Sequence, residues 1–189
     1  MQLWVGLGNP GSEHAGQRHN VGFMAVDAVA DQFRFEPWKR QFQGWAAAGR
    51  VGTERVLLLK PATFMNESGR SVAEAARFFK LDLSALSVFH DELDLAPFKV
   101  KVKRGGGAAG HNGLRSIDAH LGQDYRRIRL GIGHPGHKDR VTGYVLGNFA
   151  KAEADPLADM LAAVAAEATL LAAQEDQRFM SDLAVRLGA

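Results

Sequence analysis

The sequence predicts a single-domain α/β fold with a twisted, mixed and largely parallel β-sheet that carries helices on both faces. Short apolar runs typical of strands alternate with segments whose apolar residues recur at helical spacing. A length of 189 residues is enough for one domain with a substantial core. No internal repeat or low-complexity linker divides the chain. We therefore expect residues 1–189 to form one domain, with a helical segment at about 151–189.

The expected elements follow one another regularly along the chain. Strands are expected at residues 3–7, 44–51, 55–59, 86–89, 99–103 and 128–132, and helices at 21–29, 72–79, 114–121 and 157–171. A Gly-Asn-Pro-Gly turn follows the first strand, and Gly122 is expected to end the third helix. Asn66 or Ser68 is expected to cap the second helix. Lysine and valine alternate strictly at residues 99–103, so this strand is expected to have one solvent-exposed, basic face.

Composition excludes several classes of function. The chain has no cysteine, which excludes disulfides, thiolate metal sites and a cysteine nucleophile. It has no run of about 18 apolar residues that would suit a membrane span, and its first residues are typical of a strand and not of a signal peptide. We expect a soluble, cytoplasmic protein without a membrane partner.

Positive charge is concentrated in one part of the chain, although the net charge is only +2. Residues 98–140 carry 10 Lys and Arg against 3 Asp and Glu. This block includes a loop of small residues at 104–113, which lies beside Lys101, Lys103 and Arg104. The pattern suits a phosphate-binding face, and a solvated surface with a flexible loop explains it about equally well.

Polar segments follow three of the predicted strands, at the positions where ligands of α/β folds bind. The segment at residues 6–11 matches G-x-G-x-x-G. A dinucleotide site is nevertheless disfavoured, because the next helix begins near Asn20 and the acidic Asp27 lies inside that helix. The other two segments are residues 90–94 and the loop at 104–113.

His19 and Asp91 form the candidate catalytic pair. His19 precedes a helix, whose positive end disfavours imidazolium and so keeps the ring neutral and able to accept a proton from water. Asp91 follows an apolar strand, where its carboxylate is expected to fix the tautomer of the ring and to stabilise the charged form. Capping or packing is the simpler interpretation of an isolated histidine, so the hypothesis requires the two side chains to meet.

Water is the expected attacking group. The sequence has no G-x-S-x-G motif and no serine that stands out as a nucleophile, so no covalent intermediate is expected. Asn9, Asn66 and Asn112 recur at the ends of elements. Each either caps a helix or turn, or offers an amide to a ligand and to a developing oxyanion.

Taken in order, the motifs resemble those of the bacterial-type peptidyl-tRNA hydrolase family over essentially the whole chain. The blocks that carry the resemblance are Val5-Gly6-Leu7-Gly8-Asn9-Pro10-Gly11, Arg18-His19-Asn20-Val21-Gly22, Phe64-Met65-Asn66-Glu67-Ser68-Gly69, His90-Asp91-Glu92-Leu93-Asp94, Gly110-His111-Asn112-Gly113-Leu114 and Gly131-Ile132-Gly133-His134-Pro135-Gly136. The resemblance implies a monomeric, metal-independent esterase without a cofactor. Its substrate would be peptidyl-tRNA, cleaved at the ester between the peptide and the terminal ribose, so that tRNA lost from stalled ribosomes is recycled.

The resemblance also implies roles for individual residues. It makes His19 the proton acceptor and Asp91 its support, and Asn9 would discriminate peptidyl-tRNA from aminoacyl-tRNA with a free amine. The oxyanion would be held by Asn9, by Asn112 or by a backbone donor. Phe64, Asn66 and Asn112 would contact the peptide and the acceptor end.

Further residues are expected to contact the tRNA. His14 stands where the family usually has tyrosine, and it is expected to stack on or hydrogen-bond to the nucleic acid. Lys103 and Arg104, in the basic block, would bind phosphates of the acceptor stem. The helix from about residue 157 and the tail at 179–187 would form a cleft wall or lid, or simply pack against the core.

Two other functions compete with hydrolysis of peptidyl-tRNA. One is a non-catalytic module that binds RNA through the basic block and the glycine-rich loop. The other is a metal-dependent phosphoesterase that uses Asp91, Glu92, Asp94 and His134, although the chain has no H-E-x-x-H or similar ligand spacing.

Overall fold

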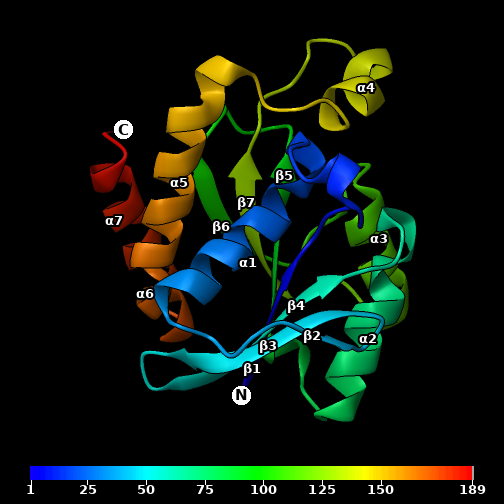
Figure 1. Cartoon of the computed structure of the whole chain (residues 1–189), viewed down its shortest axis with the longest axis vertical. Helices are drawn as coiled ribbons and strands as arrows, with labels where there is room; N and C mark the ends of the chain where they lie inside the picture. Colours follow the sequence, from blue (N-terminus) through cyan, green and yellow to red (C-terminus); the bar gives the residue numbers. More distant parts are fainter. Residues whose placement is uncertain (189) are drawn as a thin grey trace.

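One twisted β-sheet organises the molecule (Figure 1). The computed structural model describes residues 1–188. The strands lie in the order β2-β3-β4-β1-β5-β7-β6. Their bounds are β1 Gln2–Gly6, β2 Lys39–Gln41, β3 Gly44–Val51, β4 Glu54–Pro61, β5 Leu86–Glu92, β6 Val100–Arg104 and β7 Arg126–Gly131.

The four central strands run parallel and the outer strands antiparallel. β1 pairs in parallel with β4 and β5, and β5 pairs in parallel with β7. The hairpins β2-β3-β4 and the β6–β7 pair are antiparallel. The predicted α/β class with a mixed sheet is therefore confirmed. The carboxyl ends of β1, β5 and β7 meet at one edge, where α/β folds place their sites.

Helices cover both faces of the sheet, as predicted. Their bounds are α1 Val21–Gln32, α2 Ser68–Phe78, α3 Asn112–Leu121, α4 Val141–Val145, α5 Ala154–Ala166, α6 Ala168–Ala172 and α7 Asp176–Arg186. Alternate residues of β1 point to opposite faces. Trp4 therefore packs in the core beneath α1, α5 and α6, while Leu3 and Val5 pack in the core beneath α2 and α3.

Two glycines bring the start of α1 against the sheet. A Cβ on Gly6 would lie 2.2 Å from the carbonyl oxygen of Gly22, and a Cβ on Gly22 would lie 2.3 Å from the carbonyl oxygen of Phe89. Real Cβ atoms do not approach that closely. The missing side chains let the first turn of α1 lie directly on β1 and β5. This packing carries the turn before α1 to the carboxyl end of β5.

The expected C-terminal helix is divided, and it does not reach the candidate site. α5 ends at Ala166 and α6 begins at Ala168, with Glu167 between them outside helical geometry. Phe179 and Leu183 of α7 are buried in the core. Of the alternatives for the helix from about residue 157 and the tail at 179–187, packing against the core is the one observed, and neither segment lines the cleft.

Several local differences have simple causes. The edge strand β2 was not expected, because its three residues are all exposed and show no alternation. The short helix α4 was not expected either. Neither Asn66 nor Ser68 caps α2, because Glu67 precedes the helix and the Ser68 hydroxyl donates to the carbonyl of Met65. Within residues 1–188, no helix combines the length and apolar character needed to cross a membrane.

Candidate active site

A cleft of about 730 Å³ opens at the carboxyl ends of β1, β5 and β7. Its lining comes from seven places in the chain: Asn9 after β1, His19 before α1, residues 64–66 before α2, residues 90–94 at the end of β5, residues 108–112 and 114 around the start of α3, His134 after β7, and α4 with its flanks. A cavity of this size suits a small ligand or the end of a larger one.

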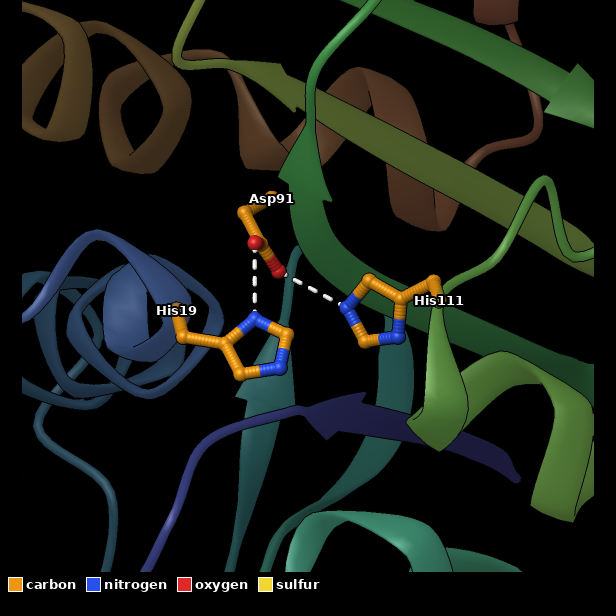
Figure 2. A group of neighbouring side chains, drawn as sticks. All are labelled: His19, Asp91 and His111. Carbon is orange, nitrogen blue, oxygen red and sulfur yellow. Dashed lines mark hydrogen bonds and ion pairs between the residues drawn. The ribbon is translucent and has the colours of Figure 1, made fainter. Parts of the chain in front are cut away.

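Asp91 joins two histidines at the floor of the cleft (Figure 2). Its Oδ2 lies 2.8 Å from Nδ1 of His19, and its Oδ1 lies 2.7 Å from Nε2 of His111. The three side chains come from the turn before α1, from β5 and from the residue before α3. The predicted contact between His19 and Asp91 is therefore present, and His111 is an additional partner.

The position of His111 fixes its tautomer. Nδ1 of this ring accepts the backbone N–H groups of Gly113 and Leu114, at 3.1 and 3.3 Å, and so caps α3. A nitrogen that accepts carries no proton, so the proton of the neutral ring sits on Nε2 and is donated to Asp91. A neutral His111 therefore makes this bond without needing a charge.

His19 has the geometry of a base. Asp91 accepts from Nδ1, which leaves Nε2 as the unprotonated nitrogen of the neutral ring. Nε2 has no hydrogen-bond partner among the side chains and backbone of residues 1–188, and His19 lines the cleft. In Figure 2 this nitrogen points away from Asp91.

The electrostatics differ from the expectation for His19. Burial alone would lower the pKa of His19, but the charge of Asp91 and its hydrogen bond outweigh burial and raise the pKa above its usual value. The carboxylate in contact, and not the helix end, is therefore the main reason why the pKa of this ring is raised although the ring is buried. A base with a raised pKa is a stronger proton acceptor.

Asp91 remains ionised in this setting. Burial would raise the pKa of its carboxyl, but the neighbouring His111 and His19 hold that pKa far below its usual value. The adjacent His90 faces another way, and its Nδ1 donates to the carbonyl of Asp91 at 2.8 Å. Burial, assisted by the nearby His111, lowers the pKa of His90 to about 4.

Asn9 is held so that its amide protons are free. Its backbone N–H and carbonyl pair with the side chain of Asn20, each at 2.9 Å. Its Oδ1 accepts the backbone N–H of Met65 at 3.1 Å. Because only the amide oxygen can accept that bond, Nδ2 is left to donate at the cleft that Asn9 lines.

Three further predicted residues lie at the cleft. Phe64 is 72% exposed, which is unusual for a large apolar side chain and places a free aromatic face at the rim. Asn66 and Asn112 also line the cleft, from the turn before α2 and from the first residue of α3. These positions fit the expected contacts with the peptide and the acceptor end.

The structure does not bring His14, Lys103 or Arg104 to the cleft. The side chain of His14 lies in a short 3₁₀ turn beside Glu13 and is not part of the cleft lining. Lys103 and Arg104 end β6, which runs antiparallel to β7, so they lie at the opposite edge of the sheet. The prediction assumed that the end of each strand reaches the same edge, and an antiparallel edge strand breaks that assumption.

Some residues of the cleft were not predicted. His111 was expected only as part of one of the motifs that carry the resemblance, and its pairing with Asp91 depends on chain segments that no local pattern connects. The wall formed by α4 and its flanks was missed, because five helical residues give too short a pattern. The glycine-rich loop is also tied down, since Arg127 donates to the carbonyls of Gly106 and Gly107 at 2.8 and 2.7 Å.

The metal-site hypothesis placed Asp91, Glu92, Asp94 and His134 together, and the described residues do not form that group. Glu92 instead accepts from Arg129 at 2.9 Å. Among residues 1–188, the side chains that could surround a cation are His19, Asp91 and His111. They would first have to give up both hydrogen bonds to the carboxylate.

The chain is similar to known peptidyl-tRNA hydrolases along nearly its whole length. The family model for peptidyl-tRNA hydrolase matches residues 3–187. A peptidyl-tRNA hydrolase of Rhizorhabdus wittichii is 71% identical over 187 residues, which cover 99% of each chain. One of Erythrobacter litoralis is 66% identical over 189 residues, which cover 100% of each chain.

A solved structure agrees with these relatives. The crystal structure of peptidyl-tRNA hydrolase from Acinetobacter baumannii has a TM-score of 0.91 and 40% sequence identity to this chain, and the match covers 97% of this chain and 94% of that one. The fold, the length and the ordered motifs therefore agree, and this chain belongs to the peptidyl-tRNA hydrolase family.

Proposed function

We propose that this chain hydrolyses the ester between the peptide and the terminal ribose of peptidyl-tRNA, with His19 as general base and water as the nucleophile. Membership of the family supports the substrate and the reaction. One observation carries the mechanism: Nδ1 of His19 is fixed on Asp91 at 2.8 Å, and its other nitrogen is left free at the cleft.

The reaction proceeds by attack of water on the ester carbonyl. Nε2 of His19 takes a proton from water as the oxygen attacks the carbonyl carbon. The tetrahedral intermediate carries a negative oxygen. It collapses when the bond to the ribose oxygen breaks, and the imidazolium returns its proton to that oxygen. The products are a free peptide acid and tRNA with an intact terminal hydroxyl.

Asp91 stabilises the charge that forms on His19. Its pKa lies far below the usual range, so it stays ionised during the reaction. His111 donates from Nε2 to the second carboxylate oxygen and fixes the orientation of the carboxylate. The base is therefore oriented before the substrate binds.

The amides around the base hold the substrate. Nδ2 of Asn9 donates to the peptide near the scissile ester, and Asn9 or Asn112 holds the developing oxyanion. Phe64 and Asn66 contact the peptide and the acceptor end from the rim. Lys103 and Arg104 act farther away, on phosphates of the acceptor stem, and His14 contacts the nucleic acid outside the cleft.

The remaining properties follow from the same arrangement. We propose that the whole chain acts as one domain and as a monomer in the cytoplasm, without a metal or cofactor. His111 supports independence from metal, because its Nε2 carries the proton that bonds to Asp91 and so has no lone pair for a cation.

Substitution of His19 tests the proposal. His19→Ala is expected to lower kcat on peptidyl-tRNA by about 10²- to 10⁴-fold, the usual contribution of a general base. His120→Ala is the matched control, because His120 is exposed in the last turn of α3 and lies outside the cleft lining. Wild-type turnover is expected to persist in a chelator. Full activity of folded His19→Ala would remove the residue from the mechanism.

A further inference from the structure

The position of the outer wall of the cleft depends on contacts with other segments of the chain. Val141, Thr142 and Val145 of α4, followed by Leu146, form this wall. A helix of five residues is too short to be stable alone in water. In Figure 1, α4 lies at one end of the molecule, away from the helical layers on the sheet. Val145 anchors the helix in the core, and polar contacts with neighbouring segments help to fix its position.

The side chain of Arg18, next to the base in sequence, reaches this wall. Its Nη1 donates to the carbonyl of Tyr144 at 3.3 Å, and its Nη2 donates to Glu153 at 3.1 Å. The guanidinium also lies over the ring of Tyr144, 4.3 Å from the centroid, and 5.7 Å from that of Phe149. A planar, forked donor that stacks on an aromatic ring is a contact that arginine makes and lysine does not.

Backbone contacts align the same two segments. The N–H of Arg18 donates to the carbonyl of Gly147 at 3.0 Å, and that of Phe149 donates to the carbonyl of Gly16 at 3.1 Å. A Cβ on Gly147 would lie 3.2 Å from Nη1 of Arg18. The glycine therefore gives the guanidinium room to approach the wall.

Several polar atoms between the His19 turn and the α4 wall lack hydrogen bonds within residues 1–188. Three buried polar atoms have no hydrogen-bond partner among the described residues: Nδ1 of His14, Oε1 of Gln17 and Nε of Arg18. Such atoms weaken the contact that buries them. Besides two backbone bonds and the burial of Val145 in the core, the Arg18 guanidinium supplies the side-chain hydrogen bond that joins the wall to the turn that carries His19.

We propose that Arg18 is a positioning residue that sets the width of the cleft by holding the α4 wall against the His19 turn. The wall and the base are thereby placed as one unit around the substrate. The proposal rests on the proposed function, because the cleft is taken to bind peptidyl-tRNA. Loss of the clamp frees the wall, which weakens substrate binding, but it leaves the contact between His19 and Asp91 intact.

Steady-state kinetics on peptidyl-tRNA test the proposal with Arg18→Met. The expected result is a KM raised about tenfold, with kcat within about threefold of wild type and an unchanged acid limb of the pH profile. A merely structural role would lower the melting temperature and the active fraction without moving KM. Arg178→Met is the control, because Arg178 makes an exposed pair with Glu175 on a helix that does not line the cleft.

Hydrogen exchange tests the clamp without activity. Amides of residues 141–149 are expected to exchange at least tenfold faster in Arg18→Met, while those of β1 and β5 keep their protection. If the wild-type protein fails to hydrolyse peptidyl-tRNA, the proposed function is wrong. Hydrogen exchange can still show in that case whether Arg18 holds the α4 wall. Should Arg18→Met not fold, Arg18→Lys replaces it, with about threefold effects expected. The proposal is wrong if Arg18→Met has the same KM as the wild-type protein, or if its amides at residues 141–149 exchange at the wild-type rate.

Discussion

His19 is the residue whose protonation state controls the proposed reaction. Only the neutral ring can accept a proton from water, so activity is present above its pKa and is lost as pH falls through it. Because Asp91 raises this pKa above its usual value of 6.5, the acid limb of kcat/KM against pH should lie above pH 6.5. A pH–rate profile of the wild-type protein on peptidyl-tRNA measures it.

Asp91→Asn tests the cause of that pKa. Without the carboxylate, burial remains and lowers the pKa of His19, so the acid limb should move to lower pH. The value of kcat should fall by about 10²- to 10⁴-fold, because the imidazolium loses its counter-charge and the ring loses its fixed tautomer. An acid limb that stays at the wild-type pH would show that another group titrates.

His111 has two separable tasks, and two substitutions distinguish them. His111→Ala removes both the cap of α3 and the bond to Asp91, whereas asparagine is a good cap that is too short to replace the imidazole at Asp91. Both variants should lose about tenfold or more in kcat, the scale of one hydrogen bond to a charged group. Only His111→Ala should also lose about 1 kcal/mol of stability. Denaturant unfolding alongside kinetics measures the two effects, and equal stability of the variants would contradict the capping role.

At the scale of elements, the approach of α1 to the sheet determines where His19 lies. A Cβ at Gly22 would meet backbone atoms of both Phe89 and Leu7, and backbone cannot move aside as a side chain tip can. Gly22→Ala should therefore cost about 1–3 kcal/mol of stability and lower activity, because the His19 turn is displaced from Asp91. Chemical denaturation and a turnover assay measure both.

Gly143→Ala is the matched control for that experiment. Gly143 also lies in a helix, and a Cβ there would have no atom within 4 Å. The substitution should leave stability unchanged or raise it by a few tenths of a kcal/mol, because alanine favours helix over glycine. If the two variants unfold alike, close packing at Gly22 is not what holds α1.

Elements with a complete local pattern could be predicted from the sequence, and the rest could not. The apolar run at the first strand and the helical spacing after Asn20 each lie within a dozen residues, and both elements are present. β2 gave no signal because its residues are exposed on both faces. The division of the C-terminal helix at Glu167 was invisible, because alanine-rich helical spacing continues through it.

At the scale of the whole molecule, sequence motifs indicated the base and its carboxylate but not how distant segments meet. The pairing of His19 with Asp91 was predicted from chemistry and from resemblance, and it is present at 2.8 Å. The second partner, His111, depends on where the glycine-rich loop returns to the cleft. The direction of β6 has no local signal, so the sequence could not show at which end of the sheet Lys103 and Arg104 lie.

The distribution of charge over the whole surface decides how the tRNA body binds. Three of the ten cations in residues 98–140 are used within the fold, because Arg126, Arg127 and Arg129 pair with carboxylates. Lys103 has no ion pair among the described residues, and Arg104 makes only a 3.4 Å bond to Gln174. Lys103 pairs in register with Arg127, four residues before the end of β7, so it lies about 13 Å along the sheet from the cleft edge.

That separation makes Lys103 and Arg104 a test of how far the bound RNA extends. If the acceptor stem runs along this edge, the double variant Lys103→Ala with Arg104→Ala should weaken tRNA binding and reduce the slope of log K against log salt by up to about 2. Turnover of an N-acylated aminoacyl ester of a single nucleotide should hardly change, because that substrate fills the cleft alone. Binding titrations at several salt concentrations, with kinetics on both substrates, measure this. Equal loss on the short and long substrates would contradict phosphate binding at this edge, and an unchanged salt slope would place the stem elsewhere on the surface.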